Sequence, residues 1–531
     1  MAAESAPKRP NVIVILCDDM GYSDIGPYGS EISTPNLDRL ARRGIRFSQF
    51  YNCARCCPTR ASLLTGLYPH RAGVGHMVND HGVGPGYQGF LRNDTVTIAE
   101  AVKSAGYRTW MSGKWHVGGT YAPNDPTSWT PGDERHPIPV QRGFDEHYGM
   151  AGGGGSYFKP PYMLENDTII DEGGPEYYLT DAISGRAVEM IDRSITQNQP
   201  FFGYVAYTAP HWPLHAWPED IERYRGRYGV GGWDALRTSR HEELNATGLL
   251  NPAWEISPRD EKSRPWADVE HKEWEDLRMA VYAAQIDRMD QGIGHILDAL
   301  DRHGIADDTD VMFLSDNGGC AEFLREEGED AQPFRYQIPT WDGRRIKVGN
   351  TPRIAPGPDD TFASYDLPWA NASNSPFRLY KHWVHEGGIS TPFIIAGPGV
   401  DSSTGIVHEP CHVIDIMPTV LDFAGATYPK ERVGHAVQSV DGVSMRPLLA
   451  GGSLDRGRPI YWEHEGNCAI RDAEWKLVRR HPEMWELYNM TEDRTELHDL
   501  AAKDTDRVRR LTRDYDGWAE ASDVLPWPVS R

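Results

Sequence analysis

The segment CCPTRASLLTG at residues 56–66 is the part of the chain best suited to nucleophilic chemistry. Pro58 stands where a first helical turn accepts proline, and Leu63 and Leu64 follow as apolar residues, so the pattern predicts a helix that begins at or just after Cys56. The first turn of a helix leaves backbone N–H groups free and carries the positive end of the helix dipole. Negative charge that develops on residue 56 would therefore be stabilised.

Two simpler interpretations of these cysteines remain open. Cys56 and Cys57 could form a buried, unreactive pair, and Cys53 with Cys56 could belong to a metal site. A closed zinc site needs four well-spaced Cys or His ligands, and no second CxxC accompanies this one. The missing second CxxC therefore argues against a closed zinc site, and a reactive Cys56 is the hypothesis that we follow.

Oxygen ligands occur in two short acidic segments. Asp18 and Asp19 directly follow an apolar run, and Asp316 and Asn317 follow another. Each pair by itself is often only a solvated turn or a helix cap. Together, and with no histidine among them, they offer an oxygen donor set that suits Ca²⁺ or Mg²⁺ better than zinc.

Cationic and imidazole side chains follow other apolar runs. Lys114 and His116 lie in GKWH at residues 113–116, His211 lies in APHWPLH at residues 209–215, and Lys381 ends SPFRLYK at residues 375–381. Taken alone, such residues more often lie in surface turns. Three other histidines compete for the same roles: His215, His382 and His385.

These segments follow elements that alternate between strand and helix. The strands are predicted at residues 11–17, 45–51, 107–112, 201–207 and 311–314, and the helices at residues 34–44, 97–106 and 277–304. Residues 11–51 predict a β-α-β unit, and the alternation predicts an α/β fold with a large, mostly parallel central sheet flanked by helices. Ligands of such sheets bind at the carboxyl ends of the strands, so the polar segments could meet in one crevice.

The remaining regions predict insertions and a second domain. Residues 152–162 and 224–268 are rich in Gly, Pro, Trp and charge without clear periodicity, and we expect loops there that cover the crevice. After residue 440 the pattern changes to short strands at 460–462, 469–471, 475–478 and 487–488 and a final amphipathic helix. We therefore predict a catalytic domain at residues 1–440 and a small α+β domain, an antiparallel sheet with a helix, at residues 441–531.

The segment at residues 56–66 closely resembles the signature of the sulfatase family. In that family the first residue of C-x-P-x-R is oxidised to formylglycine and a Thr-Gly pair follows; Cys56, Pro58, Arg60 and residues 65–66 match. The GKWH segment and the segment around Lys381 also resemble family elements. The resemblance extends from the first strand through VIDIMPT at residues 413–419 to the C-terminal region, and it is closest to bacterial arylsulfatase-like members.

The resemblance implies an alkaline-phosphatase-like fold, a formylglycine at residue 56 and one divalent ion, with Ca²⁺ favoured over Mg²⁺. It assigns the metal to the following side chains: Asp18, Asp19, residue 56, Asp316 and Asn317. It assigns catalytic roles to Cys56, Arg60, Lys114, His116, His211 and Lys381, of which Lys114, His211 and Lys381 also bind the substrate. It implies hydrolysis of aryl or related sulfate monoesters through a sulfated formylglycine, and a formylglycine-generating enzyme as a transient partner.

Composition excludes some other classes of protein. The formal net charge is −23, which argues against a large nucleic-acid footprint. No segment approaches the roughly 18 apolar residues of a membrane span. Seven cysteines, odd in number and without paired spacing, predict reduced thiols, with Cys56 as the one exception. No basic and apolar leader precedes the first strand, so we expect a cytoplasmic protein as the sequence is written, and a periplasmic one if a leader was removed.

Two rival functions remain. One keeps the fold and the formylglycine but hydrolyses phosphonate or phosphate esters; a two-metal form is disfavoured because Lys114 occupies the place where further metal ligands would be needed. The other is a non-catalytic protein that binds sulfate esters, which would follow if Cys56 stays unmodified. The sequence predicts a small-molecule or carbohydrate sulfate ester as ligand, and it predicts no oligomeric state.

Overall fold

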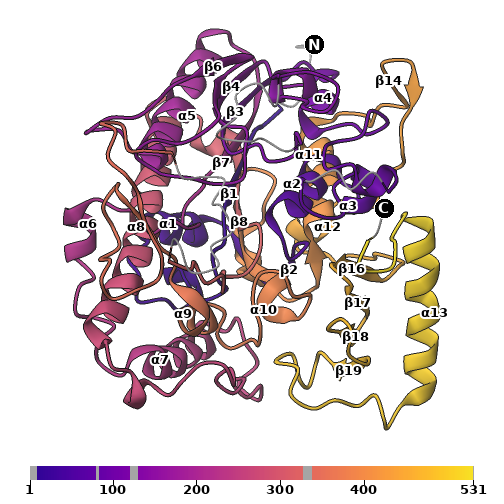
Figure 1. Ribbon diagram of the computed structural model, residues 1–531. Helices are drawn as coiled ribbons and strands as arrows, with labels where there is room; N and C mark the ends of the chain where they lie inside the picture. The colour runs from indigo at the N-terminus through magenta and orange to yellow at the C-terminus, as the bar shows by residue number, and fades with distance from the viewer. Residues whose placement is uncertain (1–8, 79–82, 120–129, 327–337, 530–531) are drawn as a thin grey trace.

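A large sheet with helices on both faces forms the centre of the computed structural model, which describes residues 9–78, 83–119, 130–326 and 338–529 (Figure 1). The sheet has eleven strands in the order β12-β2-β11-β8-β1-β7-β3-β4-β5-β6, with β13 beside β2. The strands are β1 (Asn11–Cys17), β2 (Ile45–Tyr51), β3 (Arg108–Gly113), β4 (Glu146–Met150), β5 (Met163–Glu165), β6 (Thr168–Ile170), β7 (Phe201–Ala206), β8 (Thr309–Ser315), β11 (Ser390–Ala396), β12 (Ile406–Val407) and β13 (Cys411–His412).

Neighbouring strands at the centre of the sheet are parallel. β8, β1, β7, β3 and β4 run in one direction. β11 is antiparallel to both β8 and β2, so β2 shares the direction of the central strands. At the edge beyond β4, β5 is antiparallel to β4, and β6 is antiparallel to β5. The predicted fold class is confirmed, and residues 11–51 form the predicted strand, helix and parallel strand, with β8 and β11 between the two strands of this unit.

The helices divide between the two faces of the sheet (Figure 1). One side carries α1 (Pro35–Arg43), α5 (Leu179–Thr196) and α8 (Lys272–Arg302), and the other carries α2 (Cys56–Thr65), α4 (Ile98–Lys103) and α11 (Ile416–Ala424). In β1, Ile13 and Ile15 face the first group, while Val12, Val14 and Leu16 face the second. Both faces of the strand are buried, as its continuous apolar run predicts.

The remaining elements surround this core. They are the helices α3 (Pro69–Ala72), α6 (Pro218–Glu222), α7 (Gly232–Thr247), α9 (Asp366–Ser373), α10 (Glu386–Ile389) and α12 (Arg446–Leu449), and the strand pairs β9 (Lys347–Val348) with β10 (Thr361–Phe362) and β14 (Glu431–Arg432) with β15 (His435–Ala436). The 16-residue α7 lies inside residues 224–268, so the prediction of a loop there is wrong.

The chain ends in a separate four-stranded antiparallel sheet with a helix beside it (Figure 1). Its elements are β16 (Ile460–His464), β17 (Asn467–Asp472), β18 (Trp475–Arg479), β19 (Glu486–Asn489) and α13 (Thr505–Ala521). One face of this sheet packs on α13, and the other packs on residues of the main body such as Tyr51 and Val384. Met445 and Leu448, beyond residue 440, belong to the core under the main sheet. The division at residue 440 remains a prediction.

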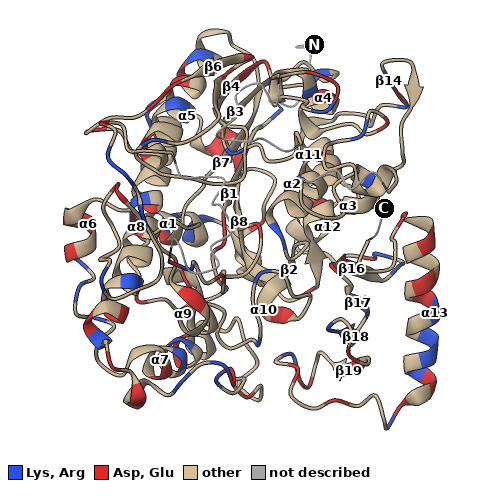
Figure 2. Cartoon of the chain, in the orientation of Figure 1, with Lys and Arg blue, Asp and Glu red and all other residues tan. Residues whose placement is uncertain are grey.

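Acidic and basic side chains are interspersed along α13, as Figure 2 shows. Among the described helices, none combines the length and the apolar character that crossing a bilayer requires.

Candidate active site

The ends of the central strands bring the candidate residues together. β8 leads into Asp316, β1 into Asp18, and β3 into Lys114, and these strands run parallel with β7 between β1 and β3. β2 has the same direction, so α2, which follows it, begins at the same edge of the sheet. β11 runs the opposite way, so the chain before it, which carries Lys381, also reaches this edge. One sheet edge therefore collects residues from five distant segments.

Cys56 is the first residue of α2, as the sequence predicts. Its side chain is buried, and its sulfur, the sulfur of Cys57 and a ring nitrogen of His116 lie within 4.8 Å of one another. The hydrogen bond with Cys57 and the positive charges of Lys114 and Lys381 help to outweigh burial, and the pKa of Cys56 lies well below its usual value. Cys53 instead contacts Ser62 through its sulfur, which argues against a Cys53–Cys56 metal pair.

Four oxygen-bearing side chains, Asp18, Asp19, Asp316 and Asn317, form what we call the oxygen site. All four are buried. Arg60 Nη2 donates to Asp316 Oδ2 at 3.0 Å and lies 3.4 Å from Asp18 Oδ2. Asn317 Nδ2 donates to Asp19 Oδ1 at 2.7 Å, and the backbone N–H of Asp19 donates to Asp316 Oδ1 at 3.1 Å. The two acidic segments therefore meet as predicted.

The donor set of the oxygen site fits a divalent cation. Asp18 Oδ1 and Asn317 Oδ1 are buried and have no hydrogen-bond partner within the described part of the chain. Burial, followed by the charge of Asp18, raises the pKa of Asp316 well above its usual value, which shows how closely the carboxylates are crowded. Buried oxygens without partners and adjacent carboxylates are what Ca²⁺ or Mg²⁺ would satisfy.

Two lysines lie against the oxygen site. Lys114 Nζ donates to Asp18 Oδ2, and Lys381 Nζ donates to Asp19 Oδ2 at 2.8 Å. Burial favours the neutral form of Asp18, but Lys114 and the other nearby cations outweigh it and hold its pKa at about 2. Gly113 has φ +120°, and an added Cβ would stand 2.0 Å from the carbonyl oxygen of Ala206. Glycine before Lys114 is therefore required by the backbone.

The predicted histidines lie on either side of these lysines. His211 Nε2 lies 3.4 Å from Asp19 Oδ2 and 3.5 Å from Lys381 Nζ. His116 is buried beside Cys56, and burial lowers the pKa of His116 to about 4, so its imidazole is neutral at pH 7. A neutral imidazole can accept a proton, and a protonated one can donate it.

A glycine loop at residues 152–155 fixes both histidines, and the sequence interpretation did not assign it this function. The backbone N–H of His116 donates to the carbonyl of Ala151, which leads into the loop. A Cβ on Gly153 would stand 2.6 Å from His116 Nε2, and a Cβ on Gly154 would stand 3.1 Å from His211 Cε1. The run of four glycines was the available signal, because only a chain without side chains fits against these rings.

The competing histidines lie elsewhere. His215 is held by the backbone: its Nε2 contacts the carbonyl of Thr361 at 2.7 Å and its Nδ1 accepts from Tyr157 N at 3.3 Å. His385 Nε2 lies 3.3 Å from Glu486 Oε2 in the C-terminal sheet. His382 belongs to a separate cluster, described below.

An ion pair next to Cys56 was also missed. Arg55, the N-cap residue of α2, places Nη2 2.9 Å from Glu322 Oε1, and Glu322 Oε2 accepts from Trp212 Nε1 at 2.8 Å. Burial opposes ionisation of Glu322, but Lys381 and Arg55 outweigh it and lower its pKa. These residues connect the start of α2 to the loop that carries His211.

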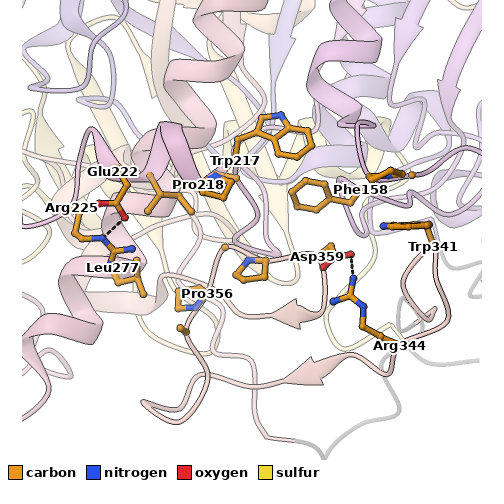
Figure 3. Close-up of a pocket in the computed structure, with 17 residues that line it drawn as sticks. Phe158, Trp217, Pro218, Glu222, Arg225, Leu277, Trp341, Arg344, Pro356 and Asp359 are labelled. Atoms are coloured by element: carbon orange, nitrogen blue, oxygen red, sulfur yellow. Dashed lines mark hydrogen bonds and ion pairs between the residues drawn. The ribbon is translucent and has the colours of Figure 1, made fainter.

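A separate cavity is lined by residues other than the predicted catalytic ones (Figure 3). It has a volume of about 470 Å³, and the aromatic rings of Phe158, Trp217 and Trp341 form part of its wall. Arg344 pairs with Asp359 at its rim, as the dashed line in Figure 3 shows. None of the predicted catalytic side chains lines this cavity.

A buried cysteine at the first turn of a helix, a set of buried oxygen ligands and two buried lysines suit a hydrolase of anionic esters, and the fold is alkaline-phosphatase-like. The sulfatase family model matches residues 10–426, and a model of the C-terminal region of N-sulphoglucosamine sulphohydrolase matches residues 377–514. An uncharacterized sulfatase of Schizosaccharomyces pombe is 33% identical over 96% of this chain and 93% of the relative. The arylsulfatase of Klebsiella aerogenes is 35% identical over 83% of this chain and 92% of the relative.

A solved structure has a similar fold. The crystal structure of Ps i-CgsB superposes with a TM-score of 0.66 at 26% identity, over 96% of this chain and 93% of that chain. The chain belongs to the sulfatase family. Its activity is accordingly the hydrolysis of sulfate esters.

Proposed function

We propose that the protein cleaves organic sulfate monoesters, of aryl or related alcohols, with a formylglycine formed from Cys56 and one divalent cation, Ca²⁺ in preference to Mg²⁺. The observation that supports this most strongly is the position of Cys56 at the first turn of α2, beside Lys114 and the oxygen site. A formylglycine-generating enzyme would have to act before or during folding, because Cys56 is 2% exposed in the folded chain.

The oxygen site and residue 56 would hold the cation, which supplies positive charge to the sulfate oxygens and favours ionisation of the nucleophile. A hydrated formylglycine supplies two hydroxyls on one carbon, one to attack sulfur and one to drive release of sulfate. Arg60, which contacts Asp316 and Asp18, holds these two carboxyl groups in position. Its guanidinium is fully buried, so this contact is rigid.

Lys114 and Lys381 would balance the charge of the sulfate oxygens during the attack. As the S–O bond to the alcohol breaks, the leaving oxygen needs a proton. His211 is placed to give it, because its Nε2 faces the side of the site where Lys381 and Asp19 meet. After His211 has given this proton, its ring is left as the neutral imidazole.

His116 would complete the cycle. Its neutral ring lies within 4.8 Å of the side chain of residue 56 and can accept the proton of the remaining hydroxyl. Loss of that proton re-forms the C=O bond and breaks the C–O bond to sulfate, so the aldehyde is regenerated and inorganic sulfate leaves.

The substrate proposal is supported by names of relatives. The Klebsiella aerogenes relative is an arylsulfatase, and a human relative at 27% identity is an N-acetylgalactosamine-6-sulfatase. An aryl sulfate is therefore the first substrate to test, followed by sulfated monosaccharides.

The decisive assay compares ester classes on one preparation of enzyme with Ca²⁺. We measure sulfate release from an aryl sulfate, and phosphate or phosphonate release from the matching aryl esters. Sulfate release with the higher kcat/KM supports the proposal. Preference for the phosphonate ester supports the rival hydrolase. Binding of the sulfate ester without turnover, in protein whose residue 56 stays an unmodified cysteine even when it is coproduced with a formylglycine-generating enzyme, supports the non-catalytic alternative.

A further inference from the structure

A second cluster of ligand-type side chains lies beside α2, outside the residues that the proposed reaction uses. We call it the His-Glu cluster: His76, His382, His464 and Glu465. His76 follows α3, His382 precedes α10, and His464 with Glu465 forms the turn between β16 and β17. Three separate segments of the chain therefore meet here, one of them from the C-terminal sheet.

Glu465 is the centre of this cluster. Its Oε1 lies 2.6 Å from His76 Nε2, and its Oε2 lies 2.9 Å from His382 Nδ1. His464 Nε2 lies 3.8 Å from Glu465 Oε1, and its ring stacks on the ring of His76 with centroids 5.7 Å apart. One ligand atom each from His382, His464 and Glu465 lies within 4.8 Å of the others.

His464 is the side chain that the protein alone does not satisfy. It is fully buried, and neither ring nitrogen has a hydrogen-bond partner within the described residues. A buried imidazole without a partner costs stability, unless another group binds it. Its Nε2 faces Glu465, so the unsatisfied nitrogen is directed into the cluster.

We propose that the His-Glu cluster binds one Zn²⁺ through His382, His464 and Glu465, with His76 as the fourth ligand. Imidazole nitrogens and one carboxylate oxygen are a donor set that suits zinc, which takes four ligands in a tetrahedron. Zinc sites place ligand atoms about 2.0–2.2 Å from the metal, so the four side chains would draw slightly inward. Any proton on a ligating imidazole leaves when the metal binds.

The charges around the cluster are compatible with a cation. Glu465 brings a carboxylate into the cluster, where it contacts His76 and His382. Arg55 is a cation that acts on His464, and its guanidinium is paired with Glu322 at 2.9 Å. Such a zinc would link the β16–β17 turn to the segments that carry His76 and His382, and would stabilise the contact between them.

The test measures Zn²⁺ binding in Cys56→Ala/Cys57→Ala protein, because these thiols and His116 could otherwise compete for zinc. Excess Ca²⁺ keeps the oxygen site occupied. Competition with a chromophoric chelator gives the affinity, metal analysis gives the stoichiometry, and Co²⁺ as a probe gives the absorption spectrum of a tetrahedral nitrogen and oxygen site. We expect one tight Zn²⁺ per chain and a zinc-dependent rise in the thermal midpoint.

Two variants and one control locate the site. His464→Gln and Glu465→Gln in the same background should each weaken zinc binding by at least about 10- to 100-fold, while His435→Gln, at an exposed histidine of β15, should leave it unchanged. If either variant fails to fold by circular dichroism, His382→Gln replaces it. No tight zinc in the parent protein, or tight zinc that survives all the cluster substitutions, overturns the proposal.

Discussion

Replacing Gly153 with alanine should slow the enzyme without unfolding it. The added Cβ would stand 2.6 Å from His116 Nε2 and 2.8 Å from its Cε1, where ordinary contacts are 3.4–4 Å. The ring must therefore move by roughly 1 Å, and a displacement of that size in a catalytic group can cost about 100-fold in rate. We expect kcat to fall by about 10- to 100-fold, which corresponds to about 1.4–2.7 kcal/mol in activation free energy.

The assay is steady-state hydrolysis of an aryl sulfate at saturating Ca²⁺, with the thermal midpoint measured on the same samples. KM should fall together with kcat, and kcat/KM should change little, because the proposed role of His116 follows formation of the enzyme-bound sulfate. Gly185→Ala in α5 is the matched control: nothing lies within 4 Å of its added Cβ, so kcat should equal that of the wild type. A Gly153→Ala enzyme with wild-type kcat would refute the position or the role that we give to His116.

Three further outcomes follow from buried charge. Lys476 pairs with Glu386 and Glu496, and all three side chains are fully buried. Lys476→Met should therefore lower the free energy of unfolding, measured in urea, by about 3–5 kcal/mol. Lys430→Met, at an exposed position, should leave it unchanged, and equal urea midpoints for the two variants would contradict this prediction. Burial raises the pKa of Asp310 to about 7 in the folded chain, whereas the pKa in the unfolded chain is about 3.9. The folded wild type therefore loses stability as the pH rises from about 4 to about 7. Asp310→Asn should therefore add about 2–4 kcal/mol at pH 8 and much less near pH 5, and a gain independent of pH would exclude this cause. Removal of divalent ions with EDTA should abolish hydrolysis, and Ca²⁺ should restore it; full activity after chelation would show that the oxygen site needs no cation.

The sequence predicted the parts of the fold that short-range patterns determine. The Val/Ile run at residues 11–17 is β1, and the proline near the start of CCPTR marks the beginning of α2. The polar segments that follow such elements could be expected at one sheet edge, since that edge collects the carboxyl ends of parallel strands. The residue types of the catalytic cluster and their meeting place were therefore predictable.

Other features depend on packing that the sequence pattern hides. β11 runs antiparallel through the sheet, and its apolar residues alone do not reveal the direction of the strand. α7 was missed because its buried face includes Arg237 and Arg240, so its apolar residues do not recur at helical spacing. Arg240 is buried because it pairs with Asp24 and Glu31, more than 200 residues away.

Contacts across long distances in the chain explain the missed site residues. Gly153 matters only because His116 packs against it, and the His-Glu cluster exists only because the β16–β17 turn reaches the loop after α3. No local spacing connects these segments. A glycine run and scattered histidines were the only signals.

The central claim is that residue 56 acts as a formylglycine. Mass spectrometry of the peptide that contains residue 56, on enzyme coproduced with a formylglycine-generating enzyme, tests it together with sulfate release by the wild type and by Cys56→Ala. We predict an aldehyde at residue 56, sulfate release that scales with the aldehyde fraction, and no release by Cys56→Ala. Sulfate release that persists in Cys56→Ala, or that proceeds undiminished with an unmodified thiol at residue 56, would contradict the account.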